Sequence, residues 1–161
     1  MVAKSKNQKT SAGLLMYRRR DGRTLEVLLA HPGGPFWARK DLGAWTIPKG
    51  EYTDEEPLAA ARREFEEETG FAPGPPFIEL DTIRQKSGKR VSAWAFEADW
   101  DPSLLRSNDF EMEWPKGSGQ MRAFPEVERA EWFTVERARE KILAAQQPLL
   151  DRLMERLAVS A

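Results

Sequence analysis

The sequence predicts an α/β protein in which helices cover a mixed β-sheet. Three observations support this fold class. Apolar runs at residues 11–17 and 25–30 flank the turn signal Asp21-Gly22, residues 57–69 have the spacing of an amphipathic helix, and two more helical segments lie near the C-terminus. Strands joined by such a turn pair antiparallel, and amphipathic helices bury their apolar sides on the faces of a sheet.

A long loop follows the predicted hairpin. Residues 31–44 contain two prolines and three glycines, which disfavour regular structure. His31 stands at the start of this loop, and we expect it to have a packing role rather than a catalytic one. After the loop, residues 45–47 are expected to form a short strand that ends at Pro48, because proline has no N–H to donate to a sheet.

The segment 57–69 gives the clearest helix signal. Pro57 suits a first helical turn, and Gly70 stands where a left-handed C-terminal cap is expected. Three apolar residues recur at helical spacing and predict the buried side of the helix: Leu58, Ala61 and Phe65.

The second half of the chain completes the sheet and adds helices. We expect strands at 77–84, 90–99 and 130–133, an irregular stretch at 101–125, and helices at 135–145 and 148–158 separated by Pro148. The polar residues 1–9 are expected to be a flexible tail. Residues 10–161 are expected to form a single domain, which is an ordinary size for one hydrophobic core.

The composition excludes several classes of function. The 25 basic and 26 acidic residues nearly cancel, which does not favour binding to a nucleic acid polymer. The chain has no cysteine, so disulfides and thiolate metal sites are excluded. No apolar run is long enough to span a membrane, and the polar N-terminus is unlike a signal peptide. We therefore expect a cytoplasmic protein with no membrane partner.

Three glutamates of the predicted helix lie on one side of it at a cost in free energy. Glu64, Glu67 and Glu68 are spaced three and four residues apart, so their side chains are neighbours and repel one another. They also lie near the C-terminal end of the helix, where its dipole disfavours negative charge. Mg²⁺ or Mn²⁺ would offset this repulsion, because both prefer oxygen ligands. Arg63 or Arg62 is placed to pin one of the carboxylates.

The acidic segment is part of a longer pattern. From Gly50 the chain reads G-x4-E-x7-R-E-F-E-E-E-T-G-F, which resembles the Nudix box, G-x5-E-x7-R-E-U-x-E-E-x-G-U, where U is apolar. The stretch before the first glutamate is one residue short if Glu55 is aligned by helical register. The alternative, Glu56, keeps the length of the loop but shortens the helical spacing. We prefer Glu55, since a loop tolerates a deletion better than a helix does.

The resemblance implies a Nudix-type α/β/α sandwich that hydrolyses a nucleoside diphosphate linked to another moiety, with Mg²⁺ or Mn²⁺. In this interpretation Glu64, Glu67 and Glu68 bind the metal, and the Lys49 carbonyl also reaches it. Arg63 belongs to the catalytic group. Gly50 allows close approach of the backbone, and the cationic Lys49 lies near a bound phosphate.

An additional acidic residue is expected from the segment before the last strand. In FPEVERAEWF, residues 124–133, Glu126 stands at a position where many Nudix enzymes have a further glutamate, and Glu128 is the competing candidate. Either Glu126 or one of the three helix glutamates then acts as the general base.

The expected substrate is a small-molecule nucleotide. The segment WTIPKGEY resembles the lead-in of the diadenosine tetraphosphate hydrolase branch, which diphosphoinositol phosphohydrolases partly share. In the loop GGPFWARKD, residues 33–41, we expect aromatic rings to stack on adenine and cations to meet phosphates. The residues concerned are Phe36, Trp37, Arg39 and Lys40; the alternative is that Phe36 and Trp37 plug the edge of the core.

Three functions remain open at this point. The first is metal-dependent hydrolysis of a dinucleoside polyphosphate. The second is removal of oxidised nucleoside triphosphates. The third is a Nudix-like module that binds a nucleotide or a protein without turnover; the presence of all three helix glutamates weighs against it.

Overall fold

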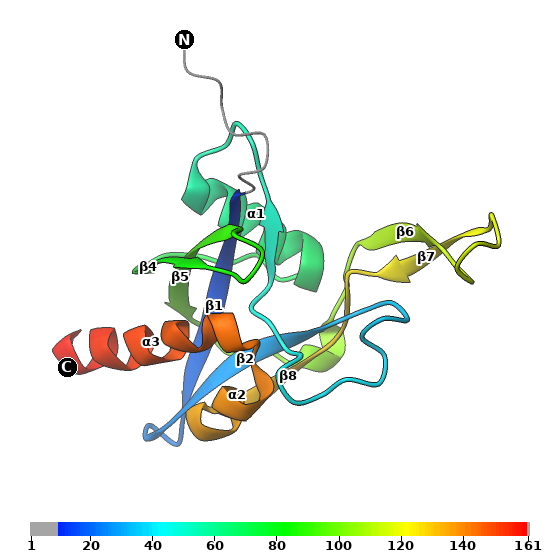
Figure 1. Ribbon diagram of the computed structural model, residues 1–161. Helices are drawn as coiled ribbons and strands as arrows, with labels where there is room; N and C mark the ends of the chain where they lie inside the picture. Colours follow the sequence, from blue (N-terminus) through cyan, green and yellow to red (C-terminus); the bar gives the residue numbers. More distant parts are fainter. Residues whose placement is uncertain (1–9, 161) are drawn as a thin grey trace, which may run out of the picture.

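The structure is a computed structural model that describes residues 10–160 (Figure 1), so the tail expected at residues 1–9 lies outside the described residues. The helices are α1 (Pro57–Thr69), α2 (Val135–Lys141) and α3 (Gln147–Ser160). The strands are β1 (Thr10–Arg20), β2 (Thr24–Pro32), β3 (Lys49–Glu51), β4 (Ile78–Arg84), β5 (Arg90–Glu97), β6 (Asp109–Glu113), β7 (Met121–Pro125) and β8 (Val127–Thr134).

The main sheet has six strands and is mixed, as predicted. Five strands follow the order β4-β5-β1-β2-β8, and β3 pairs with β1. The β1–β5 pair is parallel, and the other pairs are antiparallel. The predicted hairpin is confirmed, because Asp21 and Gly22 both adopt positive φ angles of 53° and 69° between β1 and β2. The N–H of Arg23 donates to the Arg20 carbonyl at 2.9 Å and closes this turn, whose two central residues have the positive φ that hairpin turns favour.

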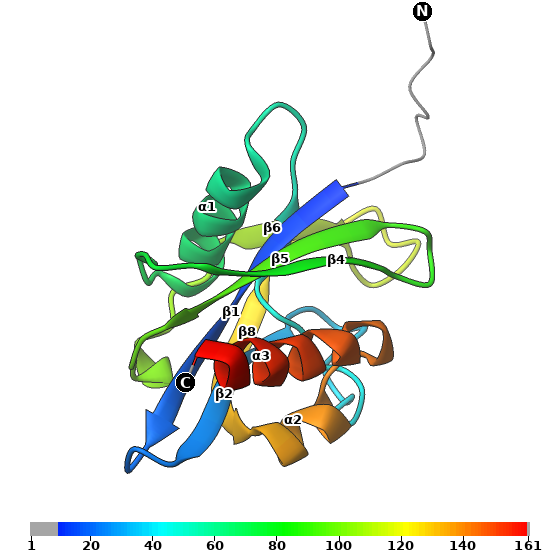
Figure 2. The same cartoon turned by 90° about the vertical axis from the view of Figure 1, so that its left-hand side faces the viewer.

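Helices cover both faces of the sheet, which confirms the expected α/β/α sandwich. Alternate side chains of β1 point to opposite faces. Leu14 and Met16 pack in a buried cluster with Phe65 of α1, whereas Leu15 packs in a second cluster with Leu150 of α3. Figure 2 shows α1 on one side of the strands and α2 and α3 on the other. Each such buried side chain stabilises the fold by roughly 1.5–3 kcal/mol.

One edge of β1 is shared by two strands, and this arrangement positions the candidate site. The start of β1, Ser11 to Gly13, pairs with β3, whereas its end, from Tyr17 onward, pairs with β2. The strand expected at 45–47 is therefore wrong in position: these residues make only isolated bridges, and the strand lies at Lys49–Glu51. Pro48, which has no N–H, separates the two sets of contacts.

The prediction that the stretch 101–125 is irregular is wrong. A 3₁₀ turn at Pro102–Leu104 is followed by the β6–β7 hairpin, which forms a separate two-stranded sheet. The hairpin projects from the body of the molecule in Figure 1. Apolar Phe110 and Met112 alternate with acidic residues in β6, which is the pattern of a half-exposed strand.

The C-terminal segment also differs in its boundaries. The last strand is longer than predicted, and α2 ends at Lys141 rather than at residue 145. A 3₁₀ turn at Ala144–Gln146 leads into α3, so Pro148 lies in the first turn of α3 rather than between two helices. Proline is well tolerated there, because a first-turn N–H has no partner within the helix. Among the described residues, no helix combines the length and apolar character needed to cross a membrane.

Candidate active site

Helix α1 has the predicted boundaries and register. Its C-terminal cap is Gly70, at a φ of 86°, whose N–H donates to the Glu66 carbonyl at 2.8 Å. Phe65 is fully buried, whereas the Glu66 side chain is exposed, as expected. The buried face of α1 is therefore fixed against the sheet, and the neighbouring face carries the acidic residues beside β3.

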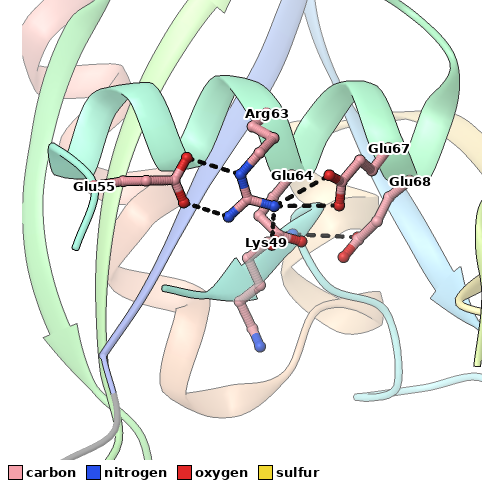
Figure 3. A network of polar contacts seen from close by, with 6 residues as sticks. All are labelled: Lys49, Glu55, Arg63, Glu64, Glu67 and Glu68. Atoms are coloured by element: carbon pink, nitrogen blue, oxygen red, sulfur yellow. Dashed lines mark hydrogen bonds and ion pairs between the residues drawn. The ribbon is translucent and has the colours of Figure 1, made fainter. Parts of the chain in front are cut away.

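Arg63 draws the acidic residues of this region together (Figure 3). Its Nε and Nη2 donate to the two carboxylate oxygens of Glu55, at 2.8 and 2.5 Å. Its Nη1 donates to Glu64 at 2.9 Å and to Glu67 at 3.1 Å. These bonds raise the pKa of Arg63, chiefly through Glu55, and lower the pKa of Glu55. One guanidinium therefore offsets the repulsion between two of the three helix glutamates.

The contacts of Arg63 also distinguish two alternatives of the sequence alignment. Glu55 makes the paired contact, whereas Glu56 is the residue that caps the start of α1 and makes no side-chain capping bond. Arg62 turns away from the acidic group, because its guanidinium lies over the Phe77 ring at 5.2 Å. The structure thus agrees with the alignment that takes Glu55 as the first glutamate of the motif.

Gly50 makes room for Glu64. A Cβ atom added to Gly50 would lie 1.9 Å from Oε1 of Glu64, which is far below any normal contact distance. The Glu64 carboxylate is therefore seated directly against the β3 backbone, with only 12% of its side chain exposed. The spacing from Gly50 to Glu64 in the sequence motif has a steric reason in this structure.

Glu68 is the most deeply buried carboxylate of the group. It is 8% exposed, and the backbone N–H of Lys49 donates to its Oε1 at 3.3 Å. Burial, followed by the nearby charges of Glu64 and Glu126, raises the pKa of Glu68 to about 8. Burial also raises the pKa of Glu64 and of Glu126. The site has more buried negative charge than its cations offset, so it favours a proton or a metal ion.

These acidic side chains line one cavity of about 390 Å³. It includes the helix glutamates and Glu126, which enters from the segment between β7 and β8. Of the two candidates for the additional glutamate, Glu126 therefore lies in the acidic cavity. Glu128 lies elsewhere, with its Oε1 2.7 Å from Nδ1 of the fully buried His31.

The donor set of this cavity suits a hard divalent cation. Five glutamates line it, and their carboxylates present only oxygen atoms, which is the ligand chemistry that Mg²⁺ and Mn²⁺ prefer. Within residues 10–160, however, no three of these carboxylates are arranged so that they could hold one ion together. Arg63 holds Glu64 and Glu67, and Glu67 is 41% exposed. The residues fit the ion by type, and Arg63 is the cation with which the ion would compete.

A second hollow of about 390 Å³ shares one lining residue, Glu126, with the acidic cavity. It lies between the 33–37 loop and strand β6, and its aromatic and sulfur-containing lining consists of Phe36, Trp37, Phe110 and Met112. Phe110 and Met112 were not identified from the sequence, because their strand was not predicted. The alternation of apolar and acidic residues in β6 was the available signal.

The four predicted loop residues have different surroundings. Phe36 is 64% exposed, whereas Trp37 is half-buried and packs against the core as well as lining the hollow. The Lys40 ammonium lies 3.8 Å from the centre of the Phe36 ring. Arg39 is exposed and lines neither of these two cavities. The buried His31 side chain holds the loop in place, because its Nε2 is 2.6 Å from the Lys40 carbonyl oxygen.

Comparison with known proteins agrees with this geometry. The family model of the NUDIX domain matches residues 7–153. Among solved structures, the NUDIX domain of Shewanella oneidensis NrtR in complex with ADP ribose is 20% identical, with a TM-score of 0.63 and coverage of 95% of this chain and 90% of that one. A C. elegans Ap4A hydrolase binary complex is 24% identical, with a TM-score of 0.61 and coverage of 94% and 98%.

A third solved structure, the MutT protein from Methanosarcina mazei Go1, is 19% identical, with a TM-score of 0.59 and coverage of 96% of this chain and 99% of that one. Comparison with curated proteins found no match. The structural likenesses concern the fold, and the family model covers most of the sequence. This chain therefore belongs to the NUDIX domain family.

Proposed function

We propose that this protein hydrolyses a pyrophosphate bond in a dinucleoside polyphosphate such as diadenosine tetraphosphate, with Mg²⁺ or Mn²⁺ as cofactor. The observation that carries this proposal is that two different cavities share Glu126 in their linings. One is acidic and suits a metal with phosphates, and the other is aromatic and suits a nucleobase. A nucleotide laid across Glu126 would place its base and its phosphates in matching surroundings.

In this proposal Glu64, Glu67 and Glu68 hold the metal, and the Lys49 carbonyl assists. When bound, the ion offsets the negative charge of the phosphate oxygens and makes water a better nucleophile. Arg63 orients Glu64 and Glu67 through its Nη1 contacts. Burial of Glu68 and Glu64 limits their motion, so that the ligand oxygens are held in place before the substrate arrives.

Glu126 is the best candidate for the general base. It lies apart from the Arg63 network and lines both cavities, and burial raises its pKa, which strengthens the carboxylate as a base. Glu126→Gln should lower kcat by about 10²–10⁴-fold with little change in KM, since a general base contributes about that much. Glu131→Gln, an exposed change on strand β8, which begins directly after Glu126, is the matched control. A wild-type kcat in Glu126→Gln would mean that one of the helix glutamates, and not Glu126, is the general base.

We assign the nucleobase of the substrate to the aromatic hollow. There it would contact Phe36 and Trp37 from the loop and Phe110 and Met112 from β6. The Lys40 ammonium lies over the Phe36 ring. It would either move to bind a phosphate of the substrate or stay at the ring as a positive charge beside the hollow. The same hollow would accept the base of an oxidised nucleoside triphosphate, the competing substrate class. The similarity to C. elegans Ap4A hydrolase and the WTIPKGEY segment support the dinucleoside substrate.

Product analysis distinguishes the substrates most directly. The protein is incubated with diadenosine tetraphosphate, ADP-ribose and 8-oxo-dGTP, each with Mg²⁺, with Mn²⁺ and with EDTA, and the products are separated by ion-exchange chromatography. We expect metal-dependent cleavage with the highest kcat/KM for the dinucleoside polyphosphate. A preference for 8-oxo-dGTP would replace this substrate assignment, and binding of all three compounds without products would contradict the proposed hydrolysis.

A further inference from the structure

His31 is a fully buried polar side chain that the proposed reaction does not use. It lies next to the end of β2, and its Nε2 is 2.6 Å from the carbonyl oxygen of Lys40. A carbonyl oxygen can only accept a hydrogen bond, so Nε2 is the donor. This bond fixes the backbone at the end of the loop that carries Phe36 and Trp37, two residues that line the aromatic hollow.

Glu128 lies beside the other nitrogen of the His31 ring because of a β-bulge. In the β2–β8 pair, His31 is opposite Arg129 and Pro32 is opposite Val127, so Glu128 is the extra residue between the two pairs. In a regular ladder Glu128 would point away from the face that His31 and Arg129 share, because neighbouring residues alternate. Here its Oε1 lies 2.7 Å from Nδ1 of His31. The bulge therefore turns the carboxylate toward the buried ring.

The Glu128 carboxylate restricts the orientation of the His31 ring. Within residues 10–160, Nδ1 makes no aligned hydrogen bond, so its contact with Glu128 is one of close approach rather than a directed bond. The ring also packs against the edge of Trp45, with ring centroids 5.0 Å apart at 72°. With both neighbours in place, Nε2 stays directed at the Lys40 carbonyl.

The two ends of this loop are held from one short segment of the chain. At the start of the loop, the N–H of Gly33 donates to the Glu126 carbonyl at 3.1 Å. At its end, the Lys40 carbonyl is held by His31, which Glu128 orients. Glu126 and Glu128 flank the first residue of β8. The segment that supplies the proposed general base therefore also sets the position of the loop.

We propose that His31 and Glu128 are positioning residues for the nucleobase, and that they hold Phe36 and Trp37 in the wall of the aromatic hollow. This inference rests on the proposed function, because it concerns the base of the same nucleotide. A loop that is ordered in advance loses less conformational entropy on binding, so the intact pair raises the affinity for the base. Neither His31 nor Glu128 lines the acidic cavity, so loss of the pair should raise KM and leave kcat unchanged.

Loss of this pair should loosen the loop without releasing it. Asp41, the residue after Lys40, accepts a hydrogen bond from Nε1 of Trp45 at 2.8 Å and forms an ion pair with Lys141. These contacts do not involve His31. They keep the end of the loop at the core, so the expected effect is greater mobility rather than unfolding.

Amide hydrogen exchange, followed by mass spectrometry, measures the hold on the loop without any ligand. Glu128→Ala removes a partly exposed side chain and spares the core. Exchange at residues 33–41 should be faster in this variant than in the wild type. Glu131→Ala, an exposed change on the same strand, is the matched control and should exchange like the wild type. Equal exchange in Glu128→Ala and the wild type would overturn the positioning role, whatever ligand the protein binds.

Isothermal titration calorimetry with Mg²⁺ tests the link to the nucleobase. AMP has a base but no pyrophosphate bond to cleave, and methylenediphosphonate mimics a pyrophosphate but has no base. Glu128→Ala and His31→Leu should each raise the Kd for AMP by about tenfold, the effect of having to order two side chains on binding, and leave the Kd for methylenediphosphonate unchanged. Glu128→Gln and His31→Gln keep a polar group at each position and should restore most of the affinity for AMP.

The outcomes separate this inference from the proposed hydrolysis. Lower affinity for AMP in Glu128→Ala and His31→Leu, in a protein that cleaves no nucleotide, would support the positioning role and contradict the proposed function. Wild-type affinity for AMP in both variants of an active hydrolase would overturn the positioning role alone. An equal loss of affinity for AMP and for methylenediphosphonate would also overturn it, because both cavities would then have been damaged.

Discussion

The Glu64 carboxylate lies in the space that a side chain on Gly50 would need. A Cβ atom at Gly50 would come within 1.9 Å of one Glu64 oxygen and 2.5 Å of the other. Strand β3 and helix α1 are thus in contact through a glycine and a carboxylate, and this contact places one wall of the acidic cavity. The position of Glu64 therefore depends on a residue fourteen places earlier that has no side chain.

Gly50→Ala should displace Glu64 and lower kcat/KM for the cleaved nucleotide by about 100-fold. The methyl group forces either the carboxylate or the β3 backbone to move, and such overpacking costs about 1–3 kcal/mol in stability. Gly74→Ala is the matched control, because a Cβ there meets no atom within 4 Å. Steady-state kinetics and thermal unfolding of both variants check this prediction. Equal activity of Gly50→Ala and the wild type would show that Glu64 need not occupy its present position.

Glu68 should make the metal-free protein less stable as the pH rises from about 5 to 8. The folded carboxyl keeps its proton to a pH of about 8, whereas the unfolded one loses it near 4.5. Between these values the folded state binds more protons, so the free energy of unfolding falls with increasing pH. Burial of Glu64 and Glu126 acts in the same direction.

Urea unfolding in EDTA at pH 5.5, 7 and 8.5 measures this dependence. Glu68→Gln, which cannot ionise, should give a flatter profile than the wild type. Parallel profiles for the two proteins would mean that Glu68 ionises as readily in the folded state as in the unfolded one.

Glu55→Ala should lower kcat by about tenfold through Arg63. Loss of the paired contact frees two guanidinium donors, so that Arg63 no longer holds Glu64 and Glu67 in one orientation. Glu56→Ala is the control, since Glu56 makes no side-chain capping bond to α1. The two variants are compared by kcat at saturating metal and substrate. If Glu56→Ala is the impaired variant, Glu56 rather than Glu55 is the first glutamate of the motif.

Phe110→Ala should raise KM for an adenine nucleotide by about tenfold and change kcat little. Base stacking on an aromatic ring contributes about 1–3 kcal/mol per base. Phe110 lines the aromatic hollow but not the acidic cavity that holds the helix glutamates. Trp37→Ala should have the same effect if its ring stacks on the base.

Met121→Ala, an exposed change on the neighbouring strand β7, serves as the control for both aromatic variants. A wild-type KM in both Phe110→Ala and Trp37→Ala would place the base outside this hollow. Loss of activity in Met121→Ala as well would indicate that the β6–β7 hairpin tolerates no substitution.

The elements with strong local signals were predicted correctly. The Asp21-Gly22 turn defined the first hairpin, and Pro57 and Gly70 marked both ends of α1, whose observed boundaries are those predicted. In these segments the local conformational preferences and the apolar pattern favour the same structure. The β6–β7 hairpin was missed because its prolines and glycines resemble those of a loop. Its one apolar alternation, Phe110 and Met112, is too short to predict a strand with certainty.

The sequence predicted the residues of the acidic cavity on α1 well, but only some of the residues that line the aromatic hollow. Helical spacing alone brings Glu64, Glu67 and Glu68 to one side of α1, so their proximity followed from the sequence. The contribution of Phe110 depends on the approach of β6 to the distant 33–37 loop, which no local pattern contains. The sequence left Arg63 and Arg62 as alternatives for pinning a carboxylate. Only the structure shows that the Arg63 side chain points toward the glutamates.

The most direct test of the account is a crystal structure with Mn²⁺ and a non-hydrolysable dinucleoside polyphosphate, examined by anomalous diffraction. We expect a manganese peak at about 2.0–2.3 Å from oxygens of Glu64 and Glu68, with Arg63 withdrawn from at least one carboxylate. A well-ordered nucleotide with no manganese peak in the cavity, and with Arg63 still bonded to Glu64 and Glu67, would contradict the claim that these glutamates hold the catalytic ion.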